Sequence, residues 1–302
     1  MGASRFTLPA RPPFRLDYTA WALRRRPENI IDRWEDGAYS RVLVLEGRPY
    51  SVRAIQSGSR LKPRLEVTVR GGGAGRQSVV KPVSELLKKM LSLDADLSGF
   101  YALARGNKKL RDISAQFHGM KPPRFASVFE AAVNAVSCQQ LSLTVGITLL
   151  NRLASAFGIK DEGGAPGFPG PRELSGAMIT EIKRIGYSQA KANALAGLAA
   201  RQEKEDVLGA LEDAGDTDAM RLLTGMKGIG RWSAQYILLR GLGRLNIFPE
   251  GDSGASRALA DWLGPAEAAH SLSRFHPYGG FIYFHLLLRG LESKGYVRGY
   301  NK

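Results

Sequence analysis

The sequence lacks the features that define several large classes of protein. Cys138 is the one cysteine among 302 residues, which excludes an intrachain disulfide framework and any four-cysteine zinc or iron–sulfur site. The longest strongly apolar run, Phe281–Leu288, is far too short to cross a bilayer, and the N-terminal residues lack the apolar core of a signal peptide. We therefore expect a reducing compartment and no association with membranes.

Acidic residues are scarce relative to basic ones. The chain has 43 Lys and Arg against 28 Asp and Glu, a net charge of +15, which makes a polyanion the natural partner but indicates no particular chemistry. The 35 glycines and 15 prolines follow no fixed period, which excludes a collagen-like or low-complexity chain. With 44% hydrophobic residues, the chain is long enough for about two globular domains.

The periodicity of the hydrophobic residues changes along the chain. Over residues 39–69 apolar and polar residues alternate, as around Val42 and Val44, which is typical of an antiparallel meander with one solvated face. From about residue 83 onward, apolar residues recur at helical spacing. We predict an α+β protein with an N-terminal antiparallel sheet domain at 1–95 and a helical domain at 96–302.

Two of the predicted helices meet at a short polar corner. Apolar stripes cover Phe125–Val136 and Val145–Phe157, and Gln139 and Gln140 lie between them. The sequence therefore predicts two helices joined by a short polar turn.

Other polar residues are given their most common structural roles. Ser175 and Ser188 stand where helical patterns resume and are predicted to cap exposed backbone amides. The run Arg24–Arg26 is interpreted as a solvated face, and His285, within an apolar helix, as a hydrogen-bonded core residue.

The most specific pattern is a helix, a glycine-rich hairpin and a second helix at about 216–241. Asp216 is predicted to cap the first helix, which ends near Leu223, and the second helix runs from Trp232 to Leu239. The reversal between them is allowed by three glycines: Gly225, Gly228 and Gly230. Unsatisfied amides at the start of the second helix can hold a phosphate without reading any base.

Asp252 follows this motif and directly precedes another helical pattern. The commonest reason for an aspartate in that position is an N-cap. Capping and catalysis are compatible, because a carboxylate at a helix N-terminus is held ionised and aimed.

Several segments, in this order and spacing, resemble the helix-hairpin-helix DNA glycosylases, and most of all the bacterial 3-methyladenine DNA glycosylase II group. They are FASVFEAAVNAVSCQQLSL, GYSQAKANALAGLA, MKGIGRWSAQYILLRGLG, FPEGDSGASRAL and, more loosely, FHPYGGFIYFHLLLRG. The resemblance implies a small N-terminal sheet and an active-site cleft between two helical subdomains.

The resemblance also implies which residues carry the chemistry. The family's catalytic aspartate falls on Asp252, which would stabilise the cationic sugar and orient the attacking water. Trp232 stands where family members that also cleave the backbone have a lysine, so no Schiff base is expected. Trp232, Tyr236 and Leu287 fall at base-pocket positions, although core packing is an alternative for both aromatics. Leu287 replaces the tryptophan more usual in the group, which leaves the preferred base open.

DNA contacts are implied in the same way. Gln140 falls on the wedge that fills the gap left by a flipped nucleotide, with Gln139 and Leu141 beside it; an exposed interhelical turn is the alternative. The implied contacts to the DNA backbone are Lys227, Gly228, Gly230 and Arg231. The carbonyls that would hold a structural sodium or potassium ion are those of Thr224, Met226 and Ile229. No other cofactor is implied.

These interpretations predict a monofunctional base-excision glycosylase that acts as a monomer on double-stranded DNA. It would flip out alkylated, 3-methyladenine-type bases and hydrolyse their N-glycosidic bonds, selecting cationic bases by cation–π attraction. An oxidised-purine glycosylase with lyase activity and a non-catalytic DNA-binding protein are the alternatives. We expect it in the cytoplasm, at the nucleoid, if it is bacterial, and in the nucleus if it is eukaryotic.

Overall fold

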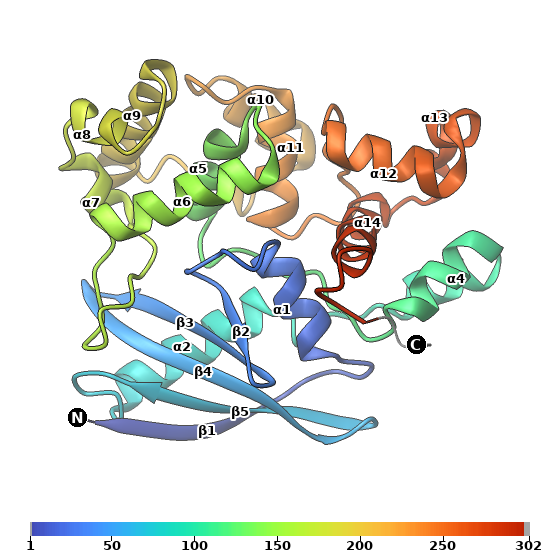
Figure 1. Ribbon diagram of the computed structural model, residues 1–302, viewed down its shortest axis with the longest axis horizontal. Coiled ribbons are helices and arrows are strands. Elements are labelled where there is room, and N and C mark those ends of the chain that lie inside the picture. The colour runs from blue at the N-terminus through green and yellow to red at the C-terminus, as the bar shows by residue number, and fades with distance from the viewer. Residues whose placement is uncertain (1, 299–302) are drawn as a thin grey trace.

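The structure is a computed structural model and describes residues 2–298, apart from the side chains of residues 269–271. Figure 1 shows an antiparallel sheet along one side of the molecule and most of the helices gathered on the other. The strands are ordered β1-β5-β4-β3-β2, and every neighbouring pair is antiparallel. They are β1 (Ala3–Pro9), β2 (Arg33–Glu35), β3 (Ala38–Leu45), β4 (Arg48–Ser59) and β5 (Lys62–Arg70).

The predicted meander is confirmed by β3, β4 and β5. Its first hairpin closes through Glu46 and Gly47, both with positive φ, a two-residue turn whose twist matches that of the strands. Asp36 and Gly37 join β2 to β3 in the same way. The sequence patterns did not predict the edge strand β1 or the helix α1 (Leu16–Arg24) that follows it.

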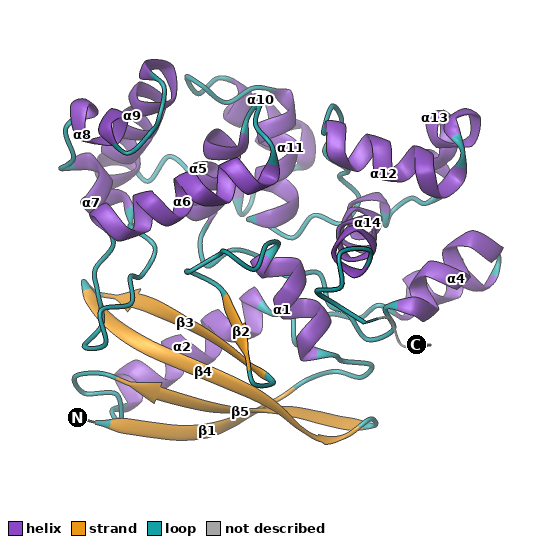
Figure 2. Ribbon diagram, in the orientation of Figure 1, coloured by secondary structure: helices purple, strands orange, loops and turns teal. Residues whose placement is uncertain are grey.

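The remaining secondary structure is helical, as predicted. Figure 2 shows helices after β5 and, up to residue 298, no further strand. The helices are α2 (Gln77–Met90), α3 (Ser98–Arg105), α4 (Lys108–Gln116), α5 (Val128–Cys138), α6 (Leu143–Phe157), α7 (Pro171–Ser175), α8 (Ile179–Arg184), α9 (Gln189–Glu205), α10 (Asp216–Thr224), α11 (Arg231–Arg240), α12 (Ser253–Leu263), α13 (Pro265–Arg274) and α14 (Gly279–Glu292). Within the described residues, none of them is long and apolar enough to cross a bilayer.

Two hydrophobic cores hold these elements together. The first joins the inner face of the sheet, with Val67 and Val69, to α2, α5, α6, α9 and α11. The second joins Tyr18 and Trp21 of α1 to α3, α4, α12 and α14. Both cores therefore contain residues from either side of residue 95.

The structure corrects two of the predicted helix caps. Ser188 does cap α9, accepting the Lys191 amide at 3.3 Å. Ser175, however, is the last residue of α7, which begins at Pro171. Asp216 is the first residue of α10 rather than its cap, because its carboxylate binds the side chains of Arg244 and Asn246.

Candidate active site

The polar corner between α5 and α6 lies against the glycine hairpin. Nε2 of Gln139 donates to the carbonyl of Gly228 at 2.8 Å and to Oγ of Ser233 at 2.7 Å. Gln140, the next residue, is exposed and has a φ of +55°. Since a non-glycine residue rarely adopts this conformation, the fold holds Gln140 at the tip of the corner against its own preference.

The hairpin is built around Gly228, whose φ is +87°. A Cβ at this position would lie 2.5 Å from the Cβ of Ala194 in α9. Close packing on α9 therefore requires glycine here, whether or not the hairpin binds a phosphate. A Cβ at Gly230 would meet no atom within 4 Å. The hairpin therefore presents an open backbone at Gly230.

The residues predicted to contact DNA are accessible. Lys227, Gly228 and Gly230 are exposed, and so is Arg231, which pairs with Glu250 at 2.9 Å on the surface. Such an exposed pair contributes little stability and leaves Arg231 available for another anion.

Asp252 is the N-cap of α12, as predicted. Its Oδ1 accepts the backbone amide of Ala255 at 2.9 Å, and its Oδ2 accepts the hydroxyl of Tyr283 at 3.2 Å (α14). Both carboxylate oxygens are thus oriented by protein donors, and each keeps a further lone pair. No pattern in the sequence marks Tyr283 as a site residue.

The Tyr283 hydroxyl acts as a donor at any physiological pH. Burial, and then the neighbouring Asp252 carboxylate, raise the pKa of Tyr283 well above its ordinary value. A protonated hydroxyl has one hydrogen to give, and here Asp252 receives it. Tyr283 therefore fixes the direction of the carboxylate.

The aromatic residues predicted for the base pocket stack on one another. The rings of Trp232 and Tyr236 lie 5.3 Å apart at an angle of 27°. Tyr236 is buried and packs near Phe125, whereas Trp232 is partly exposed. Leu287 is partly buried and packs against the second core, one turn after Tyr283 on α14.

Arg24 and Arg25 are buried, so the interpretation of Arg24–Arg26 as a solvated face was wrong for these two. Arg25 follows the last residue of α1 and has a φ of +64°, which turns its side chain into the interior. Its guanidinium donates to the hydroxyl of Tyr236 at 3.0 Å and to Oδ1 of Asn134 at 2.7 Å. Arg25 thus holds α5 and α11 in register beside the candidate pocket.

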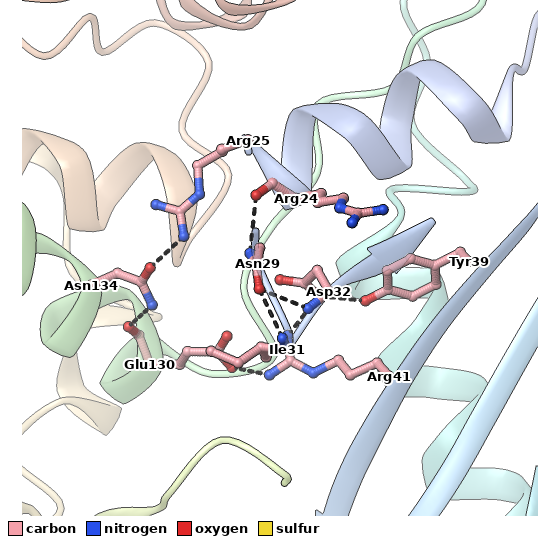
Figure 3. Close-up of polar contacts among 9 residues, drawn as sticks. All are labelled: Arg24, Arg25, Asn29, Ile31, Asp32, Tyr39, Arg41, Glu130 and Asn134. Carbon is pink, nitrogen blue, oxygen red and sulfur yellow. Dashed lines mark hydrogen bonds and ion pairs between the residues drawn. The ribbon is translucent and has the colours of Figure 1, made fainter. Parts of the chain in front are cut away.

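A buried polar network connects this arginine to the sheet (Figure 3). Arg41 on β3 binds Asp32 at 3.0 Å and Glu130 of α5 at 2.6 Å. One turn further along α5, Asn134 donates to the backbone carbonyl of Glu130 and accepts from Arg25. The network therefore runs from the sheet through α5 to Tyr236.

The other predictions concern histidine and metal. His285 is buried and its Nδ1 lies 3.0 Å from the carbonyl of Phe281, as expected for a core residue, and burial lowers the pKa of His285 to about 4. In the described part of the chain, no group of three His, Cys, Asp or Glu side chains could hold a metal ion.

A surface hollow of about 430 Å³ lies between α10, α11 and the start of α14. Asp216, Gln235 and Glu250 are among the residues that line it. Asp252, Trp232, Tyr236 and Leu287 do not line it. The hollow is therefore separate from the predicted base pocket.

Comparison with known proteins gives a consistent result. Residues 5–127 match the family model described as the AlkA N-terminal domain. A putative DNA-3-methyladenine glycosylase of Bacillus subtilis, YfjP, is 31% identical over 250 residues, which cover 82% of this chain and 84% of that protein. A Mycobacterium tuberculosis protein described as a probable bifunctional transcriptional activator and DNA repair enzyme, AlkA, is 28% identical over 94% of this chain, which spans 57% of that protein's length.

A solved structure agrees with this relationship. The 3-methyladenine DNA glycosylase from Archaeoglobus fulgidus matches with a TM-score of 0.78 and 27% identity, covering 97% of this chain and all of that one. Sequence and fold together identify the chain as a member of the AlkA-type DNA-3-methyladenine glycosylases, within the helix-hairpin-helix superfamily.

Proposed function

We propose that this chain is a monofunctional DNA glycosylase that hydrolyses the N-glycosidic bond of alkylated, 3-methyladenine-type bases in duplex DNA. The proposal rests mainly on one observation: hydrogen bonds from the Ala255 amide and the Tyr283 hydroxyl orient the Asp252 carboxylate. A carboxylate held in this way is aimed before any substrate arrives, which is the arrangement that stabilises a developing cation. The name of the Bacillus subtilis relative supports the substrate class.

Extrusion of the base requires a residue to fill the gap in the duplex. Gln140 suits this role because it is exposed at a corner whose neighbours are fixed. Gln139 is bound to the hairpin, and Nζ of Lys191 donates to the carbonyls of Ser137 and Gln139 at 3.1 and 2.8 Å. Leu141, 42% exposed, adds an apolar surface beside it.

In the bond-breaking step, the bond between the sugar C1′ and the base nitrogen breaks and its electron pair leaves with the base. Positive charge develops on the sugar, where the Asp252 carboxylate stabilises it. Water then forms the new bond to C1′, and its proton passes to the carboxylate. An alkylated base already carries positive charge, so the partly exposed ring of Trp232 would attract it.

The same assignment predicts the absence of a covalent intermediate. Trp232 has no amine, and Lys227, the nearest lysine in the hairpin, is an exposed residue that we assign to a phosphate. Incubation with lesion-containing duplex and borohydride should therefore trap no protein–DNA adduct. An adduct would favour the alternative, a glycosylase with lyase activity on oxidised purines.

Release of bases from a panel of duplexes tests the function directly. We expect release from duplexes that contain 3-methyladenine or 7-methylguanine and none from undamaged duplex. Binding to the hairpin without release from any lesion would instead support a non-catalytic DNA-binding protein.

Replacing Tyr283 by phenylalanine should lower the single-turnover rate of base release about 10-fold, because one hydrogen bond to a charged group is lost. Tyr18→Phe is the matched control, because the Tyr18 hydroxyl donates to the carbonyl of Arg298, away from Asp252. Equal effects of the two substitutions on the rate of base release would contradict the role given to Tyr283.

Further proposals concern the ion, the assembly state and the compartment. The carbonyls of Thr224, Met226 and Ile229 would hold a monovalent cation at the hairpin; that of Met226 accepts the Ile229 amide at 3.1 Å and keeps a second lone pair. The enzyme would need no other cofactor and would act as a monomer. Its location would be the nucleoid of a bacterial cell or a eukaryotic nucleus.

A further inference from the structure

The outer face of the sheet is strongly basic. Side chains alternate across the sheet, and in β5 the residues Leu65, Val67 and Val69 face the core. The exposed basic residues on the opposite side of β1, β4 and β5 are Arg5, Arg53, Lys62, Arg64 and Arg70. We call these five residues the outer sheet face. The loop between α6 and α7 covers the neighbouring part of the sheet, where Asp161 binds Ser51 and Gly167 packs on Val44.

The strand register spreads these cations across three neighbouring strands of the sheet. Arg5 of β1 and Arg53 of β4 both stand opposite Thr68 of β5, so their backbones are two strand spacings apart, about 10 Å. Arg64 and Arg70 lie on the same strand, about 20 Å apart. This arrangement matches the outside of a nucleic acid duplex, whose phosphates form a continuous line of negative charge.

The five basic side chains of the outer sheet face form no ion pair within the described residues, although Glu66 lies on the same face of β5. Arg64 makes only a long hydrogen bond to Ser57, at 3.4 Å. Residues 1–76 contain 15 Lys and Arg against seven Asp and Glu, so a quarter of the chain carries more than half of its net charge. Like charges gathered in this way repel one another, which favours a polyanionic partner.

Protection of the sheet edge does not explain this arrangement. Charged residues on an edge strand prevent pairing with other chains. Arg53, Arg64 and Arg70, however, lie on β4 and β5, which are interior strands of the sheet. Glu66 is the one acidic residue among the described residues of β1, β4 and β5.

The outer sheet face is remote from the candidate active site. In Figure 1, β1 and β5 run along the lower edge of the molecule, whereas α10, α11 and the start of α12 lie at the top. The two surfaces therefore lie on different sides of the molecule in this view.

We propose that the outer sheet face binds the phosphate backbone of a second duplex segment, so that one molecule contacts two DNA segments at once. Four of the five cations are arginines, whose planar guanidinium binds phosphate through two parallel hydrogen bonds. Contacts of this kind are with the backbone and are independent of base sequence. Simultaneous contact allows the protein to pass from one segment to another without free diffusion.

The test compares two full-length variants with the same change in charge. Arg5→Gln/Arg53→Gln/Arg70→Gln alters the outer sheet face. The control, Arg105→Gln/Lys108→Gln/Arg111→Gln, alters exposed residues of α3 and α4, none of which is in a described ion pair. The measurement is the dissociation rate of labelled, undamaged duplex at increasing concentrations of unlabelled duplex.

For the unaltered protein and the control variant, dissociation should accelerate as unlabelled duplex is added. For the sheet variant, the rate should be independent of the competitor. In the sheet variant, the negative slope of log affinity against log salt concentration for the second duplex should become shallower by about 2 to 3, the number of phosphate contacts removed. Unchanged single-turnover base release shows that the sheet variant is folded.

Three results would overturn the proposal: no acceleration in the unaltered protein, equal behaviour of the two variants, or binding of the outer sheet face to anionic lipid vesicles but not to DNA. The proposal does not depend on the glycosylase activity. If no lesion is excised and transfer between duplexes persists, the proposed function fails and the second DNA contact stands.

Discussion

Asp252→Asn should reduce the single-turnover rate of base release by at least about 100-fold, with the protein still folded. Asparagine is as good an N-cap as aspartate, so Oδ1 can still accept the Ala255 amide and α12 keeps its start. The substitution also preserves the size of the side chain beside Tyr283. What it removes is the negative charge that stabilises the developing sugar cation.

DNA binding and a matched substitution separate this charge effect from a loss of structure. Affinity for a duplex containing an abasic analogue should stay within about 10-fold of the original or improve, since an anion is removed from a site close to phosphates. Asp261→Asn removes the same charge from the exposed end of the same helix and should leave base release unchanged. Base release that is undiminished in Asp252→Asn would refute the catalytic assignment.

The parts of the site that the sequence predicted depend on local signals. The position of Asp252 before an apolar helical pattern identified it as an N-cap, and three glycines identified the reversal between α10 and α11. These signals lie within a few residues of the feature that they predict. For the same reason, the alternation of β3 to β5 predicted the meander correctly.

The parts that the sequence did not predict depend on contacts between distant residues. Tyr283 is 31 residues from Asp252, and Arg25 is 109 residues from Asn134 and 211 from Tyr236. A run of arginines is usually solvated, and the burial of Arg25 follows from the packing of the end of α1 against α5 and α11, which no pattern near residue 25 encodes. The edge strand β1 was missed because its pairing with β5 joins segments about 60 residues apart.

The buried ion pairs of Arg41 should contribute strongly to the stability of the fold. Arg41 is buried between two buried carboxylates, Asp32 and Glu130. Replacing it with methionine leaves both without their cation, and we expect a loss of about 3 to 5 kcal/mol in the free energy of unfolding at neutral pH. Urea denaturation measures this loss.

The pH dependence of the loss follows from Glu130. Burial raises the pKa of Glu130, and Arg41 offsets part of that rise. Without Arg41 the pKa rises further, so the folded protein holds a proton on Glu130 at a pH where the unfolded chain has lost it. A group whose pKa is higher in the folded protein than in the unfolded chain stabilises the fold at pH values below its unfolded pKa. This stabilisation is lost as the pH rises through its folded pKa. The deficit of Arg41→Met should therefore shrink as the pH falls from 7 toward 5.

A neutral replacement of the whole cluster is the control. Asp32→Asn/Arg41→Met/Glu130→Gln leaves no unpaired buried charge, so it should recover most of the stability that Arg41→Met alone loses. A deficit that is equal at both pH values and persists in the triple variant would mean that the shape of Arg41, rather than its charge, stabilises the fold. If the deficit follows charge, the sheet stabilises the candidate site electrostatically, because the same α5 that carries Glu130 holds Asn134 against Arg25 and so fixes Tyr236.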